Sequence, residues 1–283
     1  MKRRMVNGLM AFGAGAALTA CVAAAVALLI WLVVRGGGAL SWSFLTEPSS
    51  AAGTAGGVRY QILGTLLLAG SALALAIPAA IGLALAQTVY LPPRARGAVR
   101  GTLHLVNALP SILFGILGLL FFFGVLGWGK SWLAGGAVLA LMILPTLALS
   151  LARGIESIPP EQIEGAAGLG LTRSRIVSSV MLPQGLGALA TGSLLGLARA
   201  AGETAPILFV AAVFSGASWP DGLRDNPVLA LPYHIFVLAQ DSFQPGAQEQ
   251  LWGAALVLVL LVFAFTLAAL PLRLSNRTAD GKN

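Results

Sequence analysis

Six predominantly apolar stretches dominate this sequence, and each is long enough to cross a lipid bilayer as a helix. They cover residues 9–34, 63–90, 103–123, 132–152, 186–214 and 251–272. A span of about 20 apolar residues, at 1.5 Å per residue, crosses the hydrocarbon core. Charged residues make up only 10% of the chain, against about 25% in soluble domains. A lone strand would leave its backbone groups unpaired in lipid, so we expect an all-α membrane protein with six transmembrane helices.

The lysines and arginines between these stretches indicate the orientation. Twelve fall on one side of the predicted membrane: Lys2, Arg3, Arg4, Arg94, Arg96, Arg100, Arg153, Arg173, Arg175, Arg273, Arg277 and Lys282. Four fall on the other side: Arg35, Arg59, Lys130 and Arg224. Cytoplasmic loops carry the excess of basic residues, which predicts that both termini are cytoplasmic. Because the basic residues are scattered without a sustained basic face, the net charge of +7 does not indicate nucleic-acid binding.

The N-terminal stretch has two interpretations. Basic residues, an apolar run and Leu18-Thr19-Ala20-Cys21 together resemble a lipoprotein signal, which would leave a lipidated Cys21. The apolar run continues to Val34, however, whereas a cleaved signal has a short core followed by polar residues. A retained first helix is favoured. We divide the chain into the first helix with its outer connection (1–60), a transmembrane core (61–272) and a cytoplasmic tail (273–283).

The outer segment 215–250 contains a short apolar stretch, 228–239, bounded by Pro227 and Asp241. Twelve residues are too few to span a bilayer. An interfacial or re-entrant helix that a partner could touch is one interpretation, and a packed loop lid is the other.

A nucleotide-binding motif occurs between the third and fourth stretches but lacks its structural context. Residues 124–131 fit the phosphate-loop pattern, with Gly124, Gly129, Lys130 and Ser131 in the required places. That pattern needs a preceding buried strand and a following helix, whereas this one follows a membrane helix on the outer side. A tight turn with Lys130 at the interface is the simpler interpretation.

Catalytic and metal-binding constellations are not evident in the sequence. His104 and His234 lie far apart, without carboxylates or cysteines at ligand spacing. The single cysteine allows no internal disulfide. We therefore expect no metal, no cofactor and no enzymatic activity of the chain itself.

The cytoplasmic loop over residues 153–183 has the features of a short docking helix. Pro159-Pro160 can open a helix, and Glu161 and Glu164 place negative charge near its positive end. Gly165 and Ala166 give it a small-residue face, and Gly170 can end it. Composition alone is equally consistent with an ordinary surface helix.

The order of residues in this loop resembles the cytoplasmic signature of ABC importer permeases, E-A-A-x3-G-x9-I-x-L-P. Here it reads Glu164-Gly165-Ala166, then Gly170, Val180 and Leu182-Pro183, with glycine and valine replacing an alanine and the isoleucine. The resemblance implies a type I ABC importer permease fold. It also implies that the 159–183 loop couples to a separate ATPase through Glu161, Glu164, Gly165, Ala166, Gly170 and Pro183.

Further segments are similar to the A-type permease of phosphate importers. They are Ala200-Ala201-Gly202-Glu203-Thr204-Ala205-Pro206, Gly64-Thr65-Leu66, Pro110-Ser111-Ile112 and the stretch that begins at Leu231-Pro232-Tyr233-His234. The likeness covers residues 57–270. It implies a homologous C-type permease subunit, a cytoplasmic ATPase dimer and an extracytoplasmic phosphate-binding protein as partners, in addition to membrane lipid.

Two opposite charges, Arg199 and Glu203, lie within the fifth stretch. A charge at the bilayer centre costs about 2.5–3.5 kcal/mol on insertion scales, so we expect these two residues to have a structural or functional role. Residues four apart share a helix face and can pair. Either they line an anion pathway, with Arg199 offering a forked donor to phosphate oxygens while Glu203 neutralises it, or they form a structural ion pair.

The function expected from these features is a permease subunit of an ATP-driven phosphate importer located in the inner membrane. The alternatives are a permease for another oxyanion or for phosphonate, and a secondary transporter or channel that needs no ATPase. The ATPase-coupling signature argues against the last.

Overall fold

In the computed structural model, the described residues are 2–50, 53–224, 226–240 and 246–268. Arg273, Arg277 and Lys282, which support the predicted orientation of the C-terminus, lie outside these ranges, as do Asp241 and the predicted tail 273–283. Lys2, Arg3 and Arg4 lie in the first helix, but their side chains are not described.

Long helices account for most of the fold and confirm its predicted class. Within the described ranges, five helical segments are long and apolar enough to cross a membrane, and a bent helix pair makes six. The principal helices of the five segments are α1 (Lys2–Gly36), α3 (Arg59–Leu85), α6 (Trp132–Glu156), α9 (Leu182–Gly202) and α12 (Ala247–Ala268). A π-helical turn, η3 (Ala86–Tyr90), continues α3 to the predicted end of the second span.

The third apolar stretch is two helices, so the predicted single helix over residues 103–123 is wrong. Helix α4 (Pro93–Ala108) is followed by α5 (Ser111–Leu119) and the π-helical turn η4 (Leu120–Val125), with a bend of 93° between the two parts. Pro110 disfavours helical geometry in the residue before it, and Leu109 is extended, with ψ of 139°. The residues on both sides of this break are apolar, so the break cannot be seen in the hydropathy of the sequence.

The fifth apolar stretch is also broken, so residues 186–214 form more than one helix; the break lies between Gly202 and Pro206, which favour a kink. The observed helical segment begins earlier than residue 186, with α8 (Arg173–Ile176) and the π-helical turn η5 (Val177–Met181), and continues as α9. After Gly202 the chain is extended at Glu203, with ψ of 130°, and α10 (Ala205–Val210) follows. Pro206 has no N–H to donate to the carbonyl of Gly202, so the hydrogen-bond ladder of α9 cannot continue through it.

The core is centred on α6, which packs between α3 and α9. Close approach depends on glycines. A Cβ on Gly192 would lie 2.7 Å from that of Ser150, and one on Gly196 would lie 2.9 Å from Leu147 Cδ1. Small residues of this kind let membrane helices pack closely where burial of apolar surface gives little advantage.

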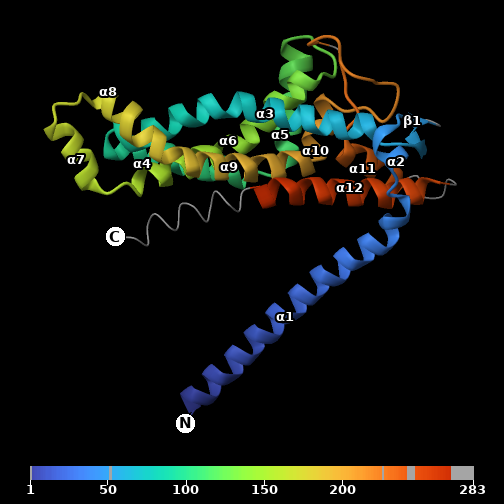
Figure 1. Cartoon of the computed structure of the whole chain (residues 1–283), viewed down its shortest axis with the longest axis horizontal. Helices are drawn as coiled ribbons and strands as arrows, with labels where there is room; N and C mark the ends of the chain where they lie inside the picture. The colour runs from blue at the N-terminus through green and yellow to red at the C-terminus, as the bar shows by residue number, and fades with distance from the viewer. Residues whose placement is uncertain (1, 51–52, 225, 241–245, 269–283) are drawn as a thin grey trace.

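The two ends of the bundle differ (Figure 1). One end carries α7 (Pro160–Gly168) and α8, in the loop that the charge distribution places in the cytoplasm. The other carries η1 (Gly37–Ala39), α2 (Trp42–Thr46) and a two-stranded antiparallel hairpin, β1 (Ser49–Ser50) with β2 (Ala55–Gly56). The outer connection therefore contains secondary structure.

Helix α11 (Leu231–Gln240) confirms that the outer segment contains a short helix. Its N-terminus is fastened to α3, because the backbone N–H of Leu231 donates to Thr65 Oγ1 at 2.9 Å. Helix α1 contacts α12 near the outer end and runs diagonally away from the rest of the bundle (Figure 1).

Candidate functional site

Arg199 and Glu203 form an ion pair at the end of α9. Arg199 lies in the last turn of the helix, and its Nε is 3.7 Å from Glu203 Oε1. Glu203, however, is the residue that follows the helix, so the pair closes across the helix end rather than along one helical face. A cation in the last turn also interacts favourably with the negative end of the helix dipole.

A second helix supplies a partner that the sequence analysis does not identify. Arg199 Nη1 donates a hydrogen bond to Asn107 Oδ1 at 2.9 Å, and Thr146 Oγ1 donates to the same oxygen at 3.4 Å. Asn107 therefore joins α4 to both α9 and α6. In the sequence, Asn107 can be recognised as a candidate only because it is a polar residue within an apolar run, three positions before a proline. We call Arg199, Glu203, Asn107 and Thr146 the Arg199 site.

The Arg199 site lies where two broken helices meet. Asn107 is one residue from the end of α4, just before the bend at Leu109, and Glu203 is at the break between α9 and α10. The segments beyond the breaks also pack together, since a Cβ on Gly115 of α5 would lie 2.9 Å from Pro206 Cα of α10. Irregular backbone at membrane depth is tolerated where it is buried in protein or lines a cavity, and transporters use discontinuous helices to form their binding sites.

The ion pair is only partly buried. The side chain of Arg199 is 33% exposed and that of Glu203 is 18% exposed, while Asn107 is exposed. The two charged side chains are thus partly accessible in the isolated chain instead of being enclosed in its core.

The cytoplasmic loop forms the expected short helix. Pro160 is in the first turn of α7, Glu161 is also in that turn, and Gly170 ends the helix in the left-handed conformation, with φ of +79°. The backbone N–H of Leu171 donates to the carbonyl of Ala166 at 3.2 Å, which completes the helix end. Thr172 precedes α8, but its side chain makes no capping hydrogen bond.

One side of α7 is available to another protein. Glu161, Glu164 and Gly165 are exposed, and no atom lies within 4 Å of a Cβ built on Gly165. Ala166 is buried, and Gln162 accepts a 2.9 Å hydrogen bond from Gln184 Nε2 of α9. Pro183, next to Gln184, is in the first turn of α9. Helix α7 is therefore held against the membrane helix that carries Arg199.

The sequence that fits the phosphate-loop pattern is a turn between η4 and α6. Gly127 has φ of +63°, and the hydroxyl of Ser131 accepts from the backbone N–H of Ala134 to cap α6. Lys130 Nζ donates to the carbonyls of Leu208 and Ala212, each at 2.9 Å, so it is engaged inside the protein. Burial also lowers the pKa of Lys130. This turn fixes α10 to the start of α6.

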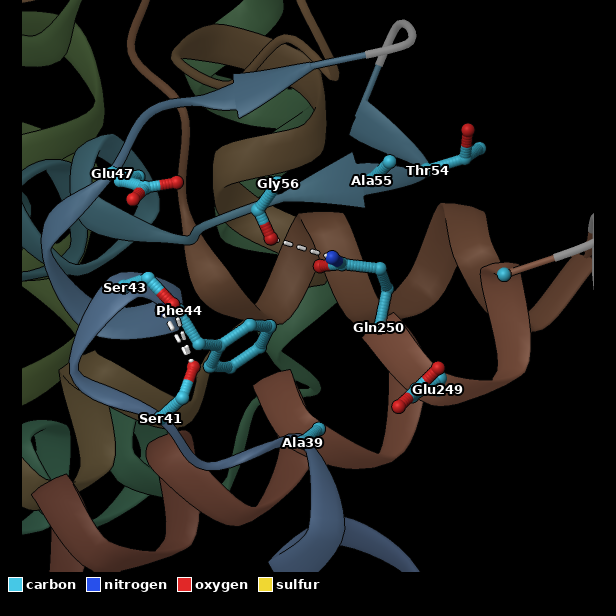
Figure 2. Close-up of a pocket in the computed structure, with 11 residues that line it drawn as sticks. Ala39, Ser41, Ser43, Phe44, Glu47, Thr54, Ala55, Gly56, Glu249 and Gln250 are labelled. Atoms are coloured by element: carbon cyan, nitrogen blue, oxygen red, sulfur yellow. Dashed lines mark hydrogen bonds between the residues drawn. The ribbon is translucent and has the colours of Figure 1, made fainter.

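The outer end contains a pocket of about 300 Å³ with acidic walls (Figure 2). Glu47 follows α2, and Glu249 lies in the first turn of α12. Gln250 Nε2 donates to the carbonyl of Gly56 at 2.6 Å, which joins α12 to the hairpin across the pocket. Both carboxylates are exposed, so the pocket offers negative charge on the outer surface.

The two histidines have different environments. His104 is exposed on α4, whereas His234 is 1% exposed on α11 and stacks on Phe214 at 5.2 Å between ring centroids. Neither ring nitrogen of His234 has a hydrogen-bond partner in the described part of the chain, and burial lowers its pKa to about 4. Among the residues that the structure describes, no three His, Cys, Asp or Glu side chains group as metal ligands.

Comparisons with known proteins identify related transport proteins. Residues 76–277 match the family described as "Binding-protein-dependent transport system inner membrane component". The chain is 30% identical over 271 residues to a probable ABC transporter permease protein, YqgI, of Bacillus subtilis, covering 91% of both chains. It is 34% identical over 213 residues to a probable phosphate transport system permease protein, PstA, of Methanocaldococcus jannaschii, covering 74% of this chain and 73% of that one.

The fold is also similar to that of a solved importer. A chain of the MetNI methionine ABC transporter, in an inward-facing conformation, superposes with a TM-score of 0.57 at 16% sequence identity. The match covers 88% of this chain and 97% of the other. At this identity the likeness supports the fold, and the substrate has to be argued from the site.

Proposed function

This chain belongs to the binding-protein-dependent transport system inner membrane components, and we propose that it is the A-type permease of a phosphate importer. Membership makes it an ABC importer permease subunit of the inner membrane with several membrane-spanning helices. Inorganic phosphate as the substrate is the further step that we propose.

The observation that carries this proposal is the Arg199 site. Arg199 presents a planar, permanently charged guanidinium, which suits the oxygens of a phosphate better than a lysine does. Glu203 neutralises it at 3.7 Å, and Asn107 orients it at 2.9 Å. An arriving anion replaces the carboxylate of Glu203 as the partner of Arg199, and the Arg199–Glu203 ion pair forms again when the anion leaves. The similarity to a relative named as a phosphate permease supports phosphate over other anions.

The importer needs a source of energy, and we propose that a cytoplasmic ATPase dimer docked on the 159–183 loop supplies it by hydrolysing ATP. Helix α7 exposes Glu164 beside open space at Gly165. Its hydrogen bond to Gln184 joins it to α9, whose far end carries Arg199. A movement of α7 is thereby passed to the helix that forms the proposed pathway.

The outer partners are assigned from position and charge. A homologous C-type permease completes the pathway on the exposed side of Arg199. An extracytoplasmic phosphate-binding protein docks at the outer end, where Glu47 and Glu249 offer carboxylates to a basic side chain.

The substrate is tested by uptake of radiolabelled phosphate in cells that depend on this chain, with unlabelled sulfate, phosphonate and phosphate as competitors. Competition by phosphate alone is the expected result. Stronger competition by a phosphonate or by sulfate makes the chain a permease for that anion. Uptake that persists when the co-purifying ATPase is inactivated by mutation identifies an ATPase-independent transporter and contradicts the proposal.

A further inference from the structure

Helix α4 carries a polar stripe that leads from the Arg199 site toward the cytoplasmic end. Arg100, His104 and Asn107 are four and three residues apart, so they share one face of the helix. Asn107 belongs to the Arg199 site. Asn107 and Arg100 are seven positions apart, which corresponds to about 10 Å at 1.5 Å per residue.

Helix α6 provides a second stripe opposite the first. Thr146 is hydrogen-bonded to Asn107, and Glu156, ten residues later, pairs with Arg100. The two helices therefore run antiparallel, with Arg153 seven residues, or about 10 Å, along α6 from Thr146. The two helices thus have polar contacts at both ends of this stretch, between Thr146 and Asn107 and between Glu156 and Arg100.

A cavity of about 200 Å³ lies at the cytoplasmic end of these stripes. Its lining residues are Arg100, His104, Leu149, Ala152 and Arg153, and we call it the cytoplasmic cavity. At about 30 Å³ per water molecule, this volume accommodates a tetrahedral oxyanion and part of its hydration shell. The Arg199 site has no residue in common with the cytoplasmic cavity.

The donors of the cytoplasmic cavity are only partly used within the chain. Arg153 Nε donates to the carbonyl of Leu149 at 3.1 Å, and its two terminal nitrogens have no partner among the described residues. His104 likewise has no hydrogen-bond partner in the described ranges. Arg100 pairs with Glu156, whereas Arg153 has no carboxylate partner among the described residues, so the local charge is positive.

A buried amide holds the remaining arginine in place. Arg100 Nε donates to Gln87 Oε1 at 3.5 Å, and Gln87 is fully buried, with its Nε2 lacking a partner in the described part of the chain. Arg100 is thus fixed on two sides, by Gln87 and by Glu156. An arginine held in this way is preorganised for an anion, because less side-chain freedom is lost on binding.

From this arrangement we infer that the cytoplasmic cavity is a second binding site for a phosphoryl oxyanion, separate from the Arg199 site. Arg153 supplies its free guanidinium nitrogens, while Arg100 and His104 complete the donor set. The phosphoryl group comes either from free inorganic phosphate that leaves the pathway or from the headgroup of a phospholipid in the cytoplasmic leaflet. The role as an exit site for transported phosphate rests on the proposed function.

The test uses a cysteine in the cavity as a reporter. In a Cys21→Ser background, Leu149→Cys is introduced, because the side chain of Leu149 lines the cavity but is not one of its proposed donors. The chain, purified with its co-purifying subunits, is then placed in nanodiscs. The rate of modification by a negatively charged thiosulfonate is measured against the concentration of inorganic phosphate. Phosphate is expected to slow the reaction. When Arg153→Gln is added, the phosphate concentration that gives half-maximal protection should rise about tenfold or more, because a hydrogen bond from a charged group is lost.

Arg175→Gln, an exposed arginine on the same side of the protein, is the matched control and should leave protection unchanged. Nanodiscs of zwitterionic and of anionic phospholipid separate the two sources. Protection by added phosphate in both identifies free phosphate. Protection that exists without added phosphate in anionic nanodiscs, and is lost with Arg153→Gln, identifies a lipid headgroup. Absence of protection in every arm overturns the cavity as a phosphoryl site.

Uptake by Arg199→Lys, measured in parallel, separates the two proposals. Reduced uptake without protection of Cys at position 149 removes the cytoplasmic site and leaves the proposed function standing. Protection together with unchanged uptake retains the cytoplasmic site and contradicts the pathway role of Arg199.

Discussion

The guanidinium of Arg199 donates a 2.9 Å hydrogen bond to the side-chain oxygen of Asn107, which is 92 residues earlier in the chain. This contact joins α9 to α4 next to the break that ends each helix. It fixes one edge of the guanidinium and leaves Nε to Glu203. The orientation of the proposed anion-binding group therefore depends on a neutral amide as well as on its counter-ion.

Removing this amide is expected to impair transport more than folding. With Asn107→Ala, Arg199 loses its 2.9 Å acceptor, and because hydrogen bonds to charged groups contribute about 1.5–3 kcal/mol, uptake of labelled phosphate should fall about tenfold or more. Thr146→Val, which removes only the longer 3.4 Å contact, is the matched control and should change uptake less. Equal losses in both variants, or none in Asn107→Ala, would contradict an orienting role.

The helix class and most of the spans follow from hydropathy because bilayer burial requires long apolar segments with their backbone groups paired. Helices α3 and α6 begin or end within a few residues of the predicted limits. The breaks at Leu109 and Glu203 do not follow from hydropathy, since the apolar character continues across both. Pro110, Gly202 and Pro206 are the local signals of these breaks, because proline and glycine favour kinks.

The candidate site could be predicted only in part. Arg199 and Glu203 stand out as charges in an apolar stretch, whereas Asn107 joins them through a contact between distant segments that no local pattern encodes. The capture of Lys130 by the carbonyls of Leu208 and Ala212 is of the same kind. In the loop, by contrast, α7 is local, so its prolines and Gly170 indicate its start and end directly.

Bulky groups on the exposed side of α7 should prevent ATPase docking without disturbing the chain. Among the described residues, nothing lies within 4 Å of a Cβ on Gly165 or Gly168, so the side chains of Gly165→Leu and Gly168→Leu start into open space. We expect normal insertion and thermal stability, but loss of uptake and of ATPase co-purification. Gly97→Leu, equally unobstructed on α4, serves as the control. Retained co-purification in both loop variants would remove the docking role of α7.

The glycines between α6 and α9 should be sensitive to size. A Cβ on Gly192 would lie 2.7 Å from Ser150 Cβ, whereas nothing lies within 4 Å of one on Gly70. Because overpacking costs about 1–3 kcal/mol, Gly192→Leu should lower the melting temperature in detergent, and Gly70→Leu should change it little. The same melting temperature for both would mean that α9 does not pack on α6 through this glycine.

The outer end should lose stability in acid because of His234. Burial lowers the pKa of His234 from 6.5 to about 4, so the unfolded chain binds a proton more readily than the folded chain does. The contribution of His234 to stability should be constant above about pH 6.5 and decrease as the pH falls toward 4, with a loss of up to about 3 kcal/mol. Thermal unfolding of the purified protein between these pH values measures the effect.

Replacement of each histidine separates this contribution from others. His234→Phe should flatten the pH dependence between pH 6.5 and 4, while His104→Gln, at the exposed histidine, should preserve it. An unchanged pH dependence in His234→Phe would assign the acid sensitivity to other groups.

The two roles of the Arg199–Glu203 pair lead to opposite results when both charges are removed. If the pair lines the anion pathway, Arg199→Lys retains the charge but loses the planar fork, so uptake should fall while thermal stability stays near that of the native chain. The double variant Arg199→Met/Glu203→Met should then be stable and inactive. If the pair is structural, each single neutralisation should lower stability because it leaves a partly buried charge unpaired, and the double variant should recover both stability and uptake. To distinguish these cases, melting temperature and phosphate uptake are measured for the single variants Arg199→Met and Glu203→Gln and for the double variant. A double variant that transports phosphate would reject the pathway role.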